Sequence, residues 1–358
     1  MRPVTIIHVA ERAKVSVKTV SRVMNNEPNV TPEMREKVMA AVTKLGYSPS
    51  NAARRMGGAK SWLLVSFNDR QLTIDNWQSA RGNDWIDQMQ HGAMLACEKA
   101  HYHFMMELID SDSPDLERNV TAVVSRLRPD GVLLTPPSSD NPIVLKALRK
   151  LEVPFVRIGS AKGKGPGHRV FMDERAATTE ITTHLIGQGH QRIALITGSP
   201  HHSSSPRKIE AFEKTMQKAG IDAADILIEP GDFTFESGLV AARHLLDRPM
   251  PPTAIIGSND EMTLAALHIA QQRGLKVPDD LALVSFDDGS GVRFSHPPIS
   301  AVHQPVAAMA GKGVEILVSI AANAEDMPET SDTLLPYSLL IRESSAKPRQ
   351  VLPGEALR

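Results

Sequence analysis

The chain has 358 residues, more than one ordinary hydrophobic core accommodates, and 41% of them are hydrophobic, which is enough for globular packing. No apolar stretch reaches the length of a membrane span, and the first residues do not form an export signal, so we expect a cytoplasmic protein with no membrane partner. A single cysteine excludes an internal disulfide framework and fits a reducing compartment.

The net charge of −1 is unevenly distributed along the chain. Residues 1–60 carry eleven lysines and arginines against four acidic residues, so the remaining chain is acidic. A basic segment on an acidic body indicates that this end binds a polyanion such as nucleic acid. Charge alone leaves a second interpretation open, which is an ordinary solvated basic terminus.

Three short helices are predicted in the first 46 residues. The first begins after Thr5 and carries apolar residues at helical spacing. The second follows a tight connection and has Ser16 as its N-cap, while the third begins at Thr31-Pro32 and ends at Gly46. Two helices joined by so short a turn, in so basic a segment, predict a helix-turn-helix DNA-binding headpiece.

The second of these helices carries the predicted DNA-reading face. Once its apolar residues are buried, its outer face presents Val17, Lys18, Ser21, Arg22 and Asn25. These side chains supply cations, a hydroxyl, an amide and a methyl-bearing group, which are the groups that hold phosphates and read base edges in a major groove. The alternative is the solvated face of a small helical bundle, which the basic context disfavours.

The pattern changes after the headpiece. Residues 48–60 are predicted to be a linker with a short hinge helix, or a disordered tether, since so short a helix is marginal in water. Beyond it, apolar strand-like runs alternate with amphipathic helical segments, which predicts parallel sheets with helices on both faces, divided into two lobes. Arg70–Asn83 is interpreted as a loop and the last dozen residues as a disordered tail. The predicted strands are Trp62–Phe67, Phe104–Ile109, Gly131–Leu134, Phe155–Ile158, Ile193–Thr197, Ala254–Gly257 and Leu281–Phe286.

Short motifs along nearly the whole chain share their order and spacing with one known protein family. They are the headpiece run 4–25, the hinge entry 45–54, and the segments Gly187–Ile193, Ser258–Asp260, Val284–Asp288, His303–Pro305 and Leu340–Ser344. Each motif is weak alone, but together they are highly specific. In these motifs the chain resembles the lactose-repressor (LacI/GalR) family of bacterial transcriptional regulators.

This resemblance implies an N-terminal all-α helix-turn-helix headpiece with a hinge helix, joined to an α/β core of two lobes like a periplasmic binding protein. The chain would pass between the lobes three times, and ligand would bind in the cleft at the carboxyl ends of the strands. The implied divisions are a headpiece at 1–47, a hinge at 48–60, a core at 61–345 and a tail at 346–358. Within the core, lobe one is expected at about 61–160 and 292–322, and lobe two at about 161–291 and 323–345.

The family resemblance also implies the residues of two binding sites. The DNA-binding candidates are Thr5, Ser16, Val17, Lys18, Thr19, Ser21, Arg22, Asn25, Asn51, Ala53 and Met56. Met56 stands where the family has a leucine that wedges between bases, and Lys14 stands in the turn where the family usually has glycine. The effector-binding candidates are Trp85, Arg207, Lys208, Phe233 and Asp260.

Several of the effector candidates have a second interpretation. Lys208 matches the family's cleft arginine with Arg207 beside it, so either cation is a candidate for the ligand contact. Asp260, or its neighbour Asn259, also stands where it can cap the following helix, and the capping and ligand-binding roles can coexist. Phe233 matches a family aromatic that stacks on ligand, and otherwise reads as core. His201, His202 and serines 203–205 are expected at the rim of the pocket.

Together these features predict a ligand-responsive transcriptional regulator, in the role of repressor, that binds a pseudo-palindromic operator as a homodimer. The expected effector is a carbohydrate or related metabolite, with purine-type ligands as the alternative, and we expect no cofactor and no metal site. An enzyme is disfavoured because no dinucleotide fingerprint, P-loop or nucleophile elbow is found. An extracytoplasmic solute receptor would need an export signal and has no use for the basic headpiece.

Overall fold

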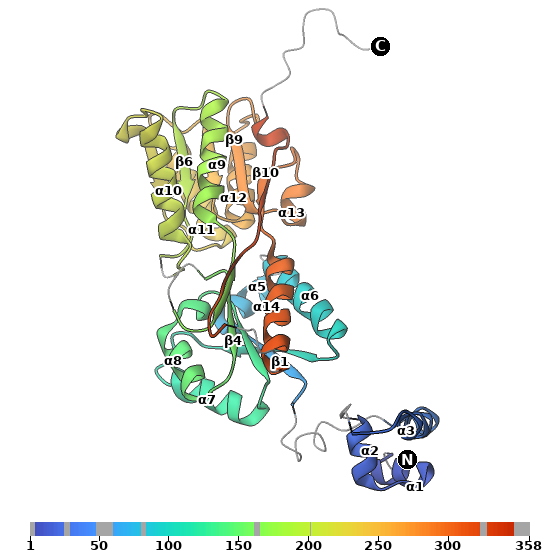
Figure 1. The fold of residues 1–358 in the computed structure, drawn as a ribbon. Helices are drawn as coiled ribbons and strands as arrows, with labels where there is room; N and C mark the ends of the chain where they lie inside the picture. Colours follow the sequence, from blue (N-terminus) through green and yellow to red (C-terminus); the bar gives the residue numbers. More distant parts are fainter. Residues whose placement is uncertain are drawn as a thin grey trace, which may run out of the picture. The chain divides into compact units, whose positions relative to one another are not determined.

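The structure is a computed structural model, and it describes residues 4–24, 29–47, 60–79, 84–160, 165–200, 202–322 and 328–346. The chain forms two compact units, residues 1–62 and residues 63–358 (Figure 1). The predicted hinge helix, the part of the predicted tail beyond Ala346, and the candidates Asn25, Asn51, Ala53, Met56 and His201 lie outside the described residues. No helix within the described ranges is both long and apolar enough to cross a bilayer.

Three helices make up the described part of the N-terminal unit. They are α1 (Ile6–Ala13), α2 (Val17–Met24) and α3 (Pro32–Leu45). Each helix contributes one fully buried valine to a shared centre, namely Val9, Val20 and Val38. The buried residues recur at helical spacing, and this pattern was the sequence signal for the three helices.

The caps of the headpiece helices are those that the sequence predicts. The Ser16 hydroxyl accepts the Thr19 N–H at 3.1 Å, and the Thr31 hydroxyl accepts the Met34 N–H at 3.3 Å. Lys14 ends α1 with φ 52° and ψ 47°, so the tight turn is built in the left-handed region without glycine. For a residue with a Cβ this conformation costs roughly 1–2 kcal/mol.

The core is built on two six-stranded sheets. The first, which defines lobe one, has the order β11-β5-β4-β3-β1-β2, and all of its neighbouring strands are parallel. Its strands are β1 (Leu63–Asp69), β2 (His103–Ile109), β3 (Gly131–Leu134), β4 (Phe155–Ile158), β5 (His168–Phe171) and β11 (Asp332–Leu334). Its helices are α5 (Arg70–Ser79), α6 (Asp84–Lys99), α7 (Leu116–Leu127), η1 (Ser138–Asp140), α8 (Pro142–Lys150) and α14 (Val306–Ala321).

Helices α6 and α14 pack against each other in lobe one, and α14 also covers strands β3, β4 and β5. The two helices approach so closely that a Cβ built on Gly92 of α6 would lie 1.9 Å from the Ala307 carbonyl oxygen. Only a residue without a side chain fits there. Helices α7 and α8 contribute to a separate apolar cluster with strands β1 and β3.

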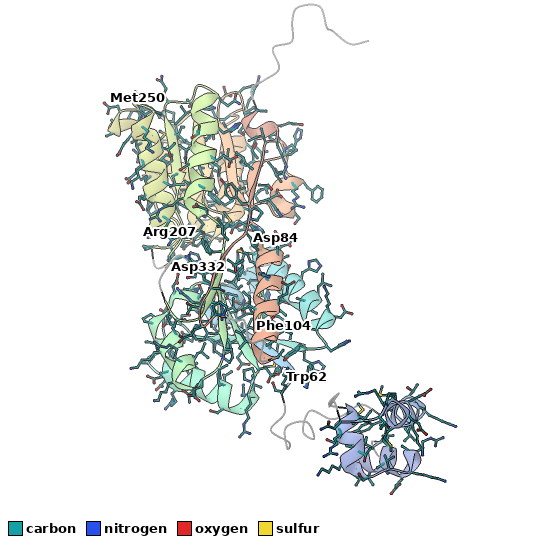
Figure 2. All side chains as sticks on the ribbon, in the orientation of Figure 1. Trp62, Asp84, Phe104, Arg207, Met250 and Asp332 are labelled. Carbon is teal, nitrogen blue, oxygen red and sulfur yellow. The ribbon has the colours of Figure 1, made fainter. Side chains whose placement is uncertain are left out.

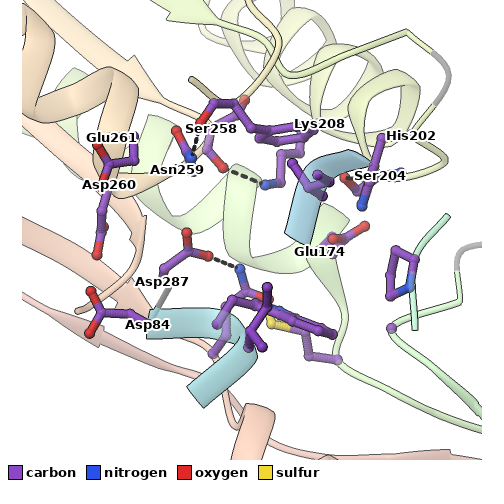
Figure 3. A pocket seen from close by; sticks show the side chains of 18 of the residues that line it. Asp84, Glu174, His202, Ser204, Lys208, Ser258, Asn259, Asp260, Glu261 and Asp287 are labelled. Carbon is purple, nitrogen blue, oxygen red and sulfur yellow. Dashed lines mark hydrogen bonds between the residues drawn. The ribbon is translucent and has the colours of Figure 1, made fainter. Parts of the chain in front are cut away.

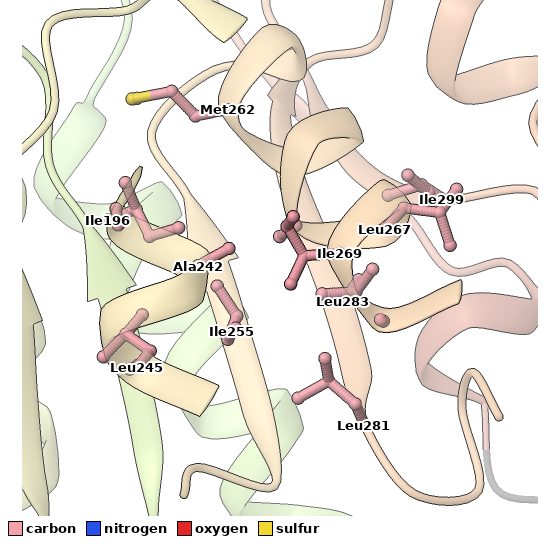
Figure 4. Packing of buried hydrophobic residues seen from close by; sticks show 14 of the residues in the cluster. Ile196, Ala242, Leu245, Ile255, Met262, Leu267, Ile269, Leu281, Leu283 and Ile299 are labelled. Carbon is pink, nitrogen blue, oxygen red and sulfur yellow. The ribbon is translucent and has the colours of Figure 1, made fainter. Parts of the chain in front are cut away.

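The second sheet, which defines lobe two, has the order β12-β10-β9-β8-β6-β7. Its strands are parallel except for the antiparallel pair of β10 and β12. Figure 4 shows Leu245 of α11 (Phe235–Leu246), Ile269 of α12 (Asp260–Gln272) and Leu283 of β9 (Ala282–Asp287) among the apolar residues that close one face. Helices α9 (Glu174–Gly187) and α10 (Ser205–Lys218) contribute to another apolar cluster with the same sheet.

In lobe two, strands and helices mostly alternate along the chain. The strands are β6 (Ile193–Ile196), β7 (Ile226–Glu229), β8 (Ala254–Gly257), β9 (Ala282–Asp287), β10 (Ser300–His303) and β12 (Ser338–Leu340). The helices are α9 (Glu174–Gly187), α10 (Ser205–Lys218), η2 (Ala223–Asp225), α11 (Phe235–Leu246), α12 (Asp260–Gln272), α13 (Ser290–Arg293) and η3 (Glu343–Ser345).

The chain passes between the two sheets three times: after β5, after β10 and after β11. The predicted lobe boundaries are therefore wrong for three segments. Residues 168–171 and 332–334 belong to the sheet of lobe one, and residues 300–303 belong to the sheet of lobe two. These short strands mix polar and apolar residues, so no apolar run distinguishes them from loops.

The predicted loop at Arg70–Asn83 is also wrong, because Arg70–Ser79 forms helix α5. Its start is stabilised by Asp69, whose carboxylate accepts the Leu72 N–H at 3.0 Å. One turn further on, the Gln71 amide donates to Asp75 at 2.8 Å. Because the helix buries little apolar surface, its apolar residues do not recur at helical spacing. Its stability comes instead from local hydrogen bonds such as the cap at Asp69.

Candidate effector pocket and DNA-reading helix

Helix α2 presents a polar surface on the N-terminal unit. Val17, Lys18 and Arg22 are exposed, whereas Thr19 and Ser21 are half-buried. Of the remaining candidates that the structure describes, Ser16 caps α2 and Thr5 lies before α1, where its N–H donates to His8 Nδ1 at 3.0 Å. All five α2 candidates thus lie opposite or beside the buried valines of the headpiece centre.

A pocket in the core lies at the carboxyl ends of the strands of both sheets, and residues of both lobes line it. Figure 2 shows Asp84 of lobe one and Arg207 of lobe two near this junction. All five predicted effector candidates line the pocket. The residues that line the pocket include Asp84, Trp85, Ser160, Glu174, His202, Arg207, Lys208, Phe233, Ser258, Asn259, Asp260, Glu261, Asp287 and Gln304.

Phe233 is held in the pocket wall by unusual local geometry. Its φ of 73° is in the left-handed region, and its carbonyl accepts the Asn259 amide at 2.8 Å. Its ring meets the edge of the His202 ring at a centroid distance of 5.0 Å and covers the Gly198 backbone so closely that a Cβ there would be 1.8 Å away. Backbone strain of this kind persists only where the surrounding contacts impose it. Phe233 is therefore held in a fixed position in the pocket wall, which an ordinary core residue does not require.

The two neighbouring cations, Arg207 and Lys208, have different environments. Lys208 is buried, and its ammonium donates to the Ser258 carbonyl at 3.0 Å and lies 3.8 Å from the centre of the Phe286 ring. Burial lowers the pKa of Lys208, while Glu174 and Asp287 oppose that shift. Within the described residues, the half-buried Arg207 guanidinium has no hydrogen-bond partner. The geometry therefore leaves Arg207 the more available cation.

Asp260 is not the helix cap that its position allowed. Asn259 fills that role, because its side-chain oxygen accepts the Met262 N–H at 3.1 Å. The buried Asp260 carboxylate instead accepts the Ser285 hydroxyl at 2.5 Å and the Gly289 N–H at 2.6 Å. Burial and then the charge of Asp287 raise the pKa of Asp260 well above its usual range. The carboxylate is thus fixed in the pocket wall.

Sequence reasoning missed four carboxylates that line the same pocket: Asp84, Glu174, Glu261 and Asp287. Asp287 ends β9 with φ 95° and accepts a hydrogen bond from the Gln304 amide. Burial, opposed by Lys208, raises the pKa of Asp287 to about 6. Burial also raises the pKa of Glu174, which Lys208 and Arg207 oppose. The sequence offered one indication of Asp287, which is that it directly follows the predicted apolar strand Leu281–Phe286, where open α/β sheets bind their ligands.

Beside the pocket, a hydrogen bond joins the two lobes. The Ser203 hydroxyl of lobe two donates to Asp140 Oδ2 of lobe one at 2.6 Å. Asp140 also accepts from the buried Arg157 guanidinium and from the Ser160 hydroxyl, each at 2.5 Å. His202 precedes this contact, and burial lowers the pKa of its ring to about 4, so the ring is neutral at physiological pH. Among the described residues, no group of three His, Cys, Asp or Glu side chains is arranged to hold a metal ion.

Comparison with known proteins covers both units of the chain. A family model described as bacterial regulatory proteins, lacI family, matches residues 5–50, and a periplasmic binding protein-like domain matches residues 182–345. Catabolite control protein A of Priestia megaterium is 30% identical over 344 residues, which cover 96% of this chain and 99% of that protein. This chain belongs to the LacI family.

Other relatives agree with that assignment. The ribose operon repressor of Escherichia coli (strain K12) is 29% identical over 314 residues, covering 88% of this chain and 92% of the repressor. The solved structure of the transcriptional regulator CelR–cellobiose complex has a TM-score of 0.71 at 28% identity and covers 95% of this chain and 99% of CelR. The lac repressor dimer bound to operator and the anti-inducer ONPF shares the fold, with a TM-score of 0.79 at 24% identity and coverage of 96% and 99%.

The LacI-family assignment confirms the predicted fold class, a helix-turn-helix region followed by a two-sheet α/β core. It also confirms a DNA-binding regulator of transcription with a sugar-binding-like domain. Members of this family are DNA-binding regulators rather than enzymes.

Proposed function

We propose that this LacI-family regulator represses transcription from the cytoplasm by binding a pseudo-palindromic operator as a homodimer, and that a small effector held between its lobes changes operator affinity. The observation that carries the proposal is the pocket, because residues of both lobes line it. A ligand that touches both lobes binds one lobe arrangement more tightly than any other. It therefore shifts the equilibrium between arrangements in proportion to that difference in affinity.

On the DNA side, we assign residues 1–47 to the operator-binding headpiece and residues 48–60 to the hinge. Arg22 and Lys18 are exposed on α2, where a guanidinium and an ammonium can contact bases and phosphates. The capped start of α2 at Ser16 directs backbone N–H groups outward, which favours a nearby phosphate. In a dimer, two such helices enter successive major grooves of a two-fold site.

On the effector side, we assign the contacts to Trp85, Arg207, Phe233 and Asp260, with Lys208 positioning the wall through Ser258 and Phe286. Aromatic faces beside fixed carboxylates suit a small polar molecule with apolar ring or chain faces, and this includes carbohydrates. Two relatives point the same way, since one is the regulator CelR in complex with cellobiose and the other is a ribose operon repressor.

The test begins with the purified full chain and a library of random duplex DNA, from which bound sequences are selected. We expect enrichment of a two-fold symmetric site, and sedimentation should give two chains per duplex. A metabolite screen by thermal shift then identifies molecules that stabilise the chain through mass action.

Coupling is measured by titrating operator with and without a stabilising metabolite. The factor by which the metabolite changes operator affinity must equal the factor by which operator changes metabolite affinity. A metabolite that saturates the pocket and leaves operator affinity unchanged would contradict the proposed function, as would an asymmetric site bound by a single chain.

A further inference from the structure

Three carboxylates from three elements converge on one side of the effector pocket. Asp84 begins α6 in lobe one, whereas Asp260 begins α12 and Asp287 ends β9 in lobe two. A Cβ built on Gly289 would lie 2.4 Å from Asp84 Oδ2 and 3.0 Å from Asp260 Oδ2, so both carboxylates approach the same stretch of backbone. Figure 3 shows Asp84, Asp260 and Asp287 on the side of the pocket opposite Glu174 and His202.

The hydrogen bonds that these carboxylates accept come from neutral groups. Asp260 is bonded to the Ser285 hydroxyl and the Gly289 N–H, and Asp287 to the Gln304 amide. Such bonds occupy lone pairs without supplying a countercharge. Like charges confined in a site of low dielectric repel one another and favour binding of a proton or a cation.

The cations of the described lining balance this side of the pocket only in part, because Lys208 alone interacts with one of its three carboxylates. Lys208 interacts with Asp287, but its ammonium is held by the Ser258 carbonyl and the Phe286 ring. The charged neighbours of Arg207 are Arg175, Glu174, Arg169 and Asp140, and none of these belongs to the three-carboxylate group. Burial is the main cause of the raised pKa values of Asp260 and Asp287, and repulsion by a neighbouring carboxylate, Asp287 for the first and Asp84 for the second, adds to it.

Independent features of the same pocket point to a ligand. The Ser258 hydroxyl lines the pocket in a side chain that is 1% exposed, and it has no hydrogen-bond partner within the described residues. A buried hydroxyl without a partner costs free energy unless a ligand satisfies it. Trp85 and Phe233 add aromatic rings, whose faces attract organic cations.

We propose that the effector carries a cationic group, an ammonium or amidinium on a small polar molecule, which is bound among Asp84, Asp260 and Asp287, while a polar atom of the same molecule bonds to Ser258. This inference rests on the proposed function and narrows the class of its effector from polar metabolites in general to amines. An uncharged polyol satisfies the free oxygen lone pairs but leaves the carboxylates unbalanced. An amino sugar or a small polyamine supplies both hydrogen-bond donors and the countercharge.

The test compares matched pairs of probes on the full chain by thermal shift. The pairs are D-glucosamine with D-glucose, D-galactosamine with D-galactose, D-mannosamine with D-mannose, and putrescine with 1,4-butanediol. We expect at least one amine to raise the Tm in a saturable way. That amine should bind at least about tenfold more tightly than its neutral partner, because a charge-assisted hydrogen bond is about twice as strong as a neutral one.

Variants locate the effect in the pocket. Asp287→Asn and, independently, Asp84→Asn should each weaken binding of that amine tenfold or more. The control Asp247→Asn removes a carboxylate of the same lobe that is 67% exposed and paired with Arg273, and it should leave amine affinity unchanged. Two variants from different lobes keep the test decisive if one of them fails to fold.

The pH dependence of the Tm, measured without ligand, is a second test of the negative charge at Asp287. The pKa of Asp287 is higher in the folded chain, at about 6, than in the unfolded chain, near 3.8. The stability that this difference contributes is therefore fully present below pH 3.8 and is lost as the pH rises through about 6. With Asp84, Asp260, Glu174 and Lys208 still facing the site, Asp287→Asn should therefore raise the Tm by about 2 °C or more at pH 8 and by much less at pH 4.

Three results would overturn the inference: a neutral probe that binds as tightly as its amine partner, a panel without any amine-dependent stabilisation, or amine binding that survives both pocket variants. The proposed function fails separately, through operator titrations in which pocket ligands leave DNA affinity unchanged. A neutral ligand that changes operator affinity would thus refute the inference and support the function.

Discussion

The hydrogen bond between Ser203 and Asp140 joins the lobes, so its loss should open them. Ser203→Ala leaves Asp140 bonded to Arg157 and Ser160, and therefore does not create an unpaired buried carboxylate. A hydrogen bond to a charged group contributes about 1.5–3 kcal/mol. At 1.4 kcal/mol per factor of ten, the equilibrium constant for lobe closure should fall by roughly ten- to a hundredfold.

Spin labels on one exposed cysteine per lobe would measure this change. Lys150 of lobe one and Met250 of lobe two are suitable positions, with exposed fractions of 75% and 63%, and the native Cys97 is buried. Labelled chains diluted into unlabelled chains report distances within one subunit. Ser203→Ala should enrich the longer interlobe distances relative to wild type.

The matched control is Ser111→Ala, which removes a serine hydroxyl 3.4 Å from Ser138 inside lobe one. It should leave the distance distribution unchanged. If Ser203→Ala also gives the wild-type distribution, the hydrogen bond between Ser203 and Asp140 does not hold the lobes together, and the prediction is refuted.

Four further predictions concern the two binding sites. Arg22→Ala should cost roughly 1–3 kcal/mol of operator binding and relax specificity at one base pair. Electrophoretic titration against single-base operator variants will measure both effects. An unchanged operator affinity would show that the face of α2 that carries Arg22 does not read the bases. Met56→Leu should preserve operator affinity and Met56→Asp should sharply reduce it without changing thermal stability of the core, whereas equal affinities would remove Met56 from the interface. Asp260→Asn should weaken effector binding by roughly one to two decades in calorimetry and leave DNA binding intact, and an unchanged effector affinity would exclude a ligand contact. Since burial holds the His202 pKa at about 4, below its unfolded 6.5, stability should fall as pH drops through that interval, and His202→Gln should lose less Tm there than wild type.

Much of the fold could be predicted because three of its described strands, β3, β6 and β8, contain only apolar residues and glycine. Gly131–Leu134 and Ile193–Ile196 are buried at every position, and a short buried run between helices has few other interpretations. Helix starts at Ser16 and Thr31 were predictable because their caps act within four residues. The strands 168–171 and 332–334 were missed because their stability comes from neighbouring strands rather than from their own apolar content.

The candidate site was predictable only in part, for a related reason. Trp85, Phe233 and Asp260 were found through family motifs, and the structure brings them into one pocket. Asp84 and Asp287 are more than two hundred residues apart, and a single carboxylate after a strand or before a helix is indistinguishable from a surface residue. Their chemistry arises from proximity, which depends on how both lobes fold.

The three crossings between the sheets also determine when lobe one can fold during synthesis. Helix α14, which covers one face of β3, β4 and β5 and packs on α6, is translated after nearly all of lobe two. A nascent chain that ends before Val306 therefore displays the apolar face of α6 around Gly92 to the solvent and to other chains. Lobe one is the first part of the core to be made and among the last to be completed, so its apolar surface stays exposed for most of the synthesis of the core, and exposed apolar surface favours aggregation.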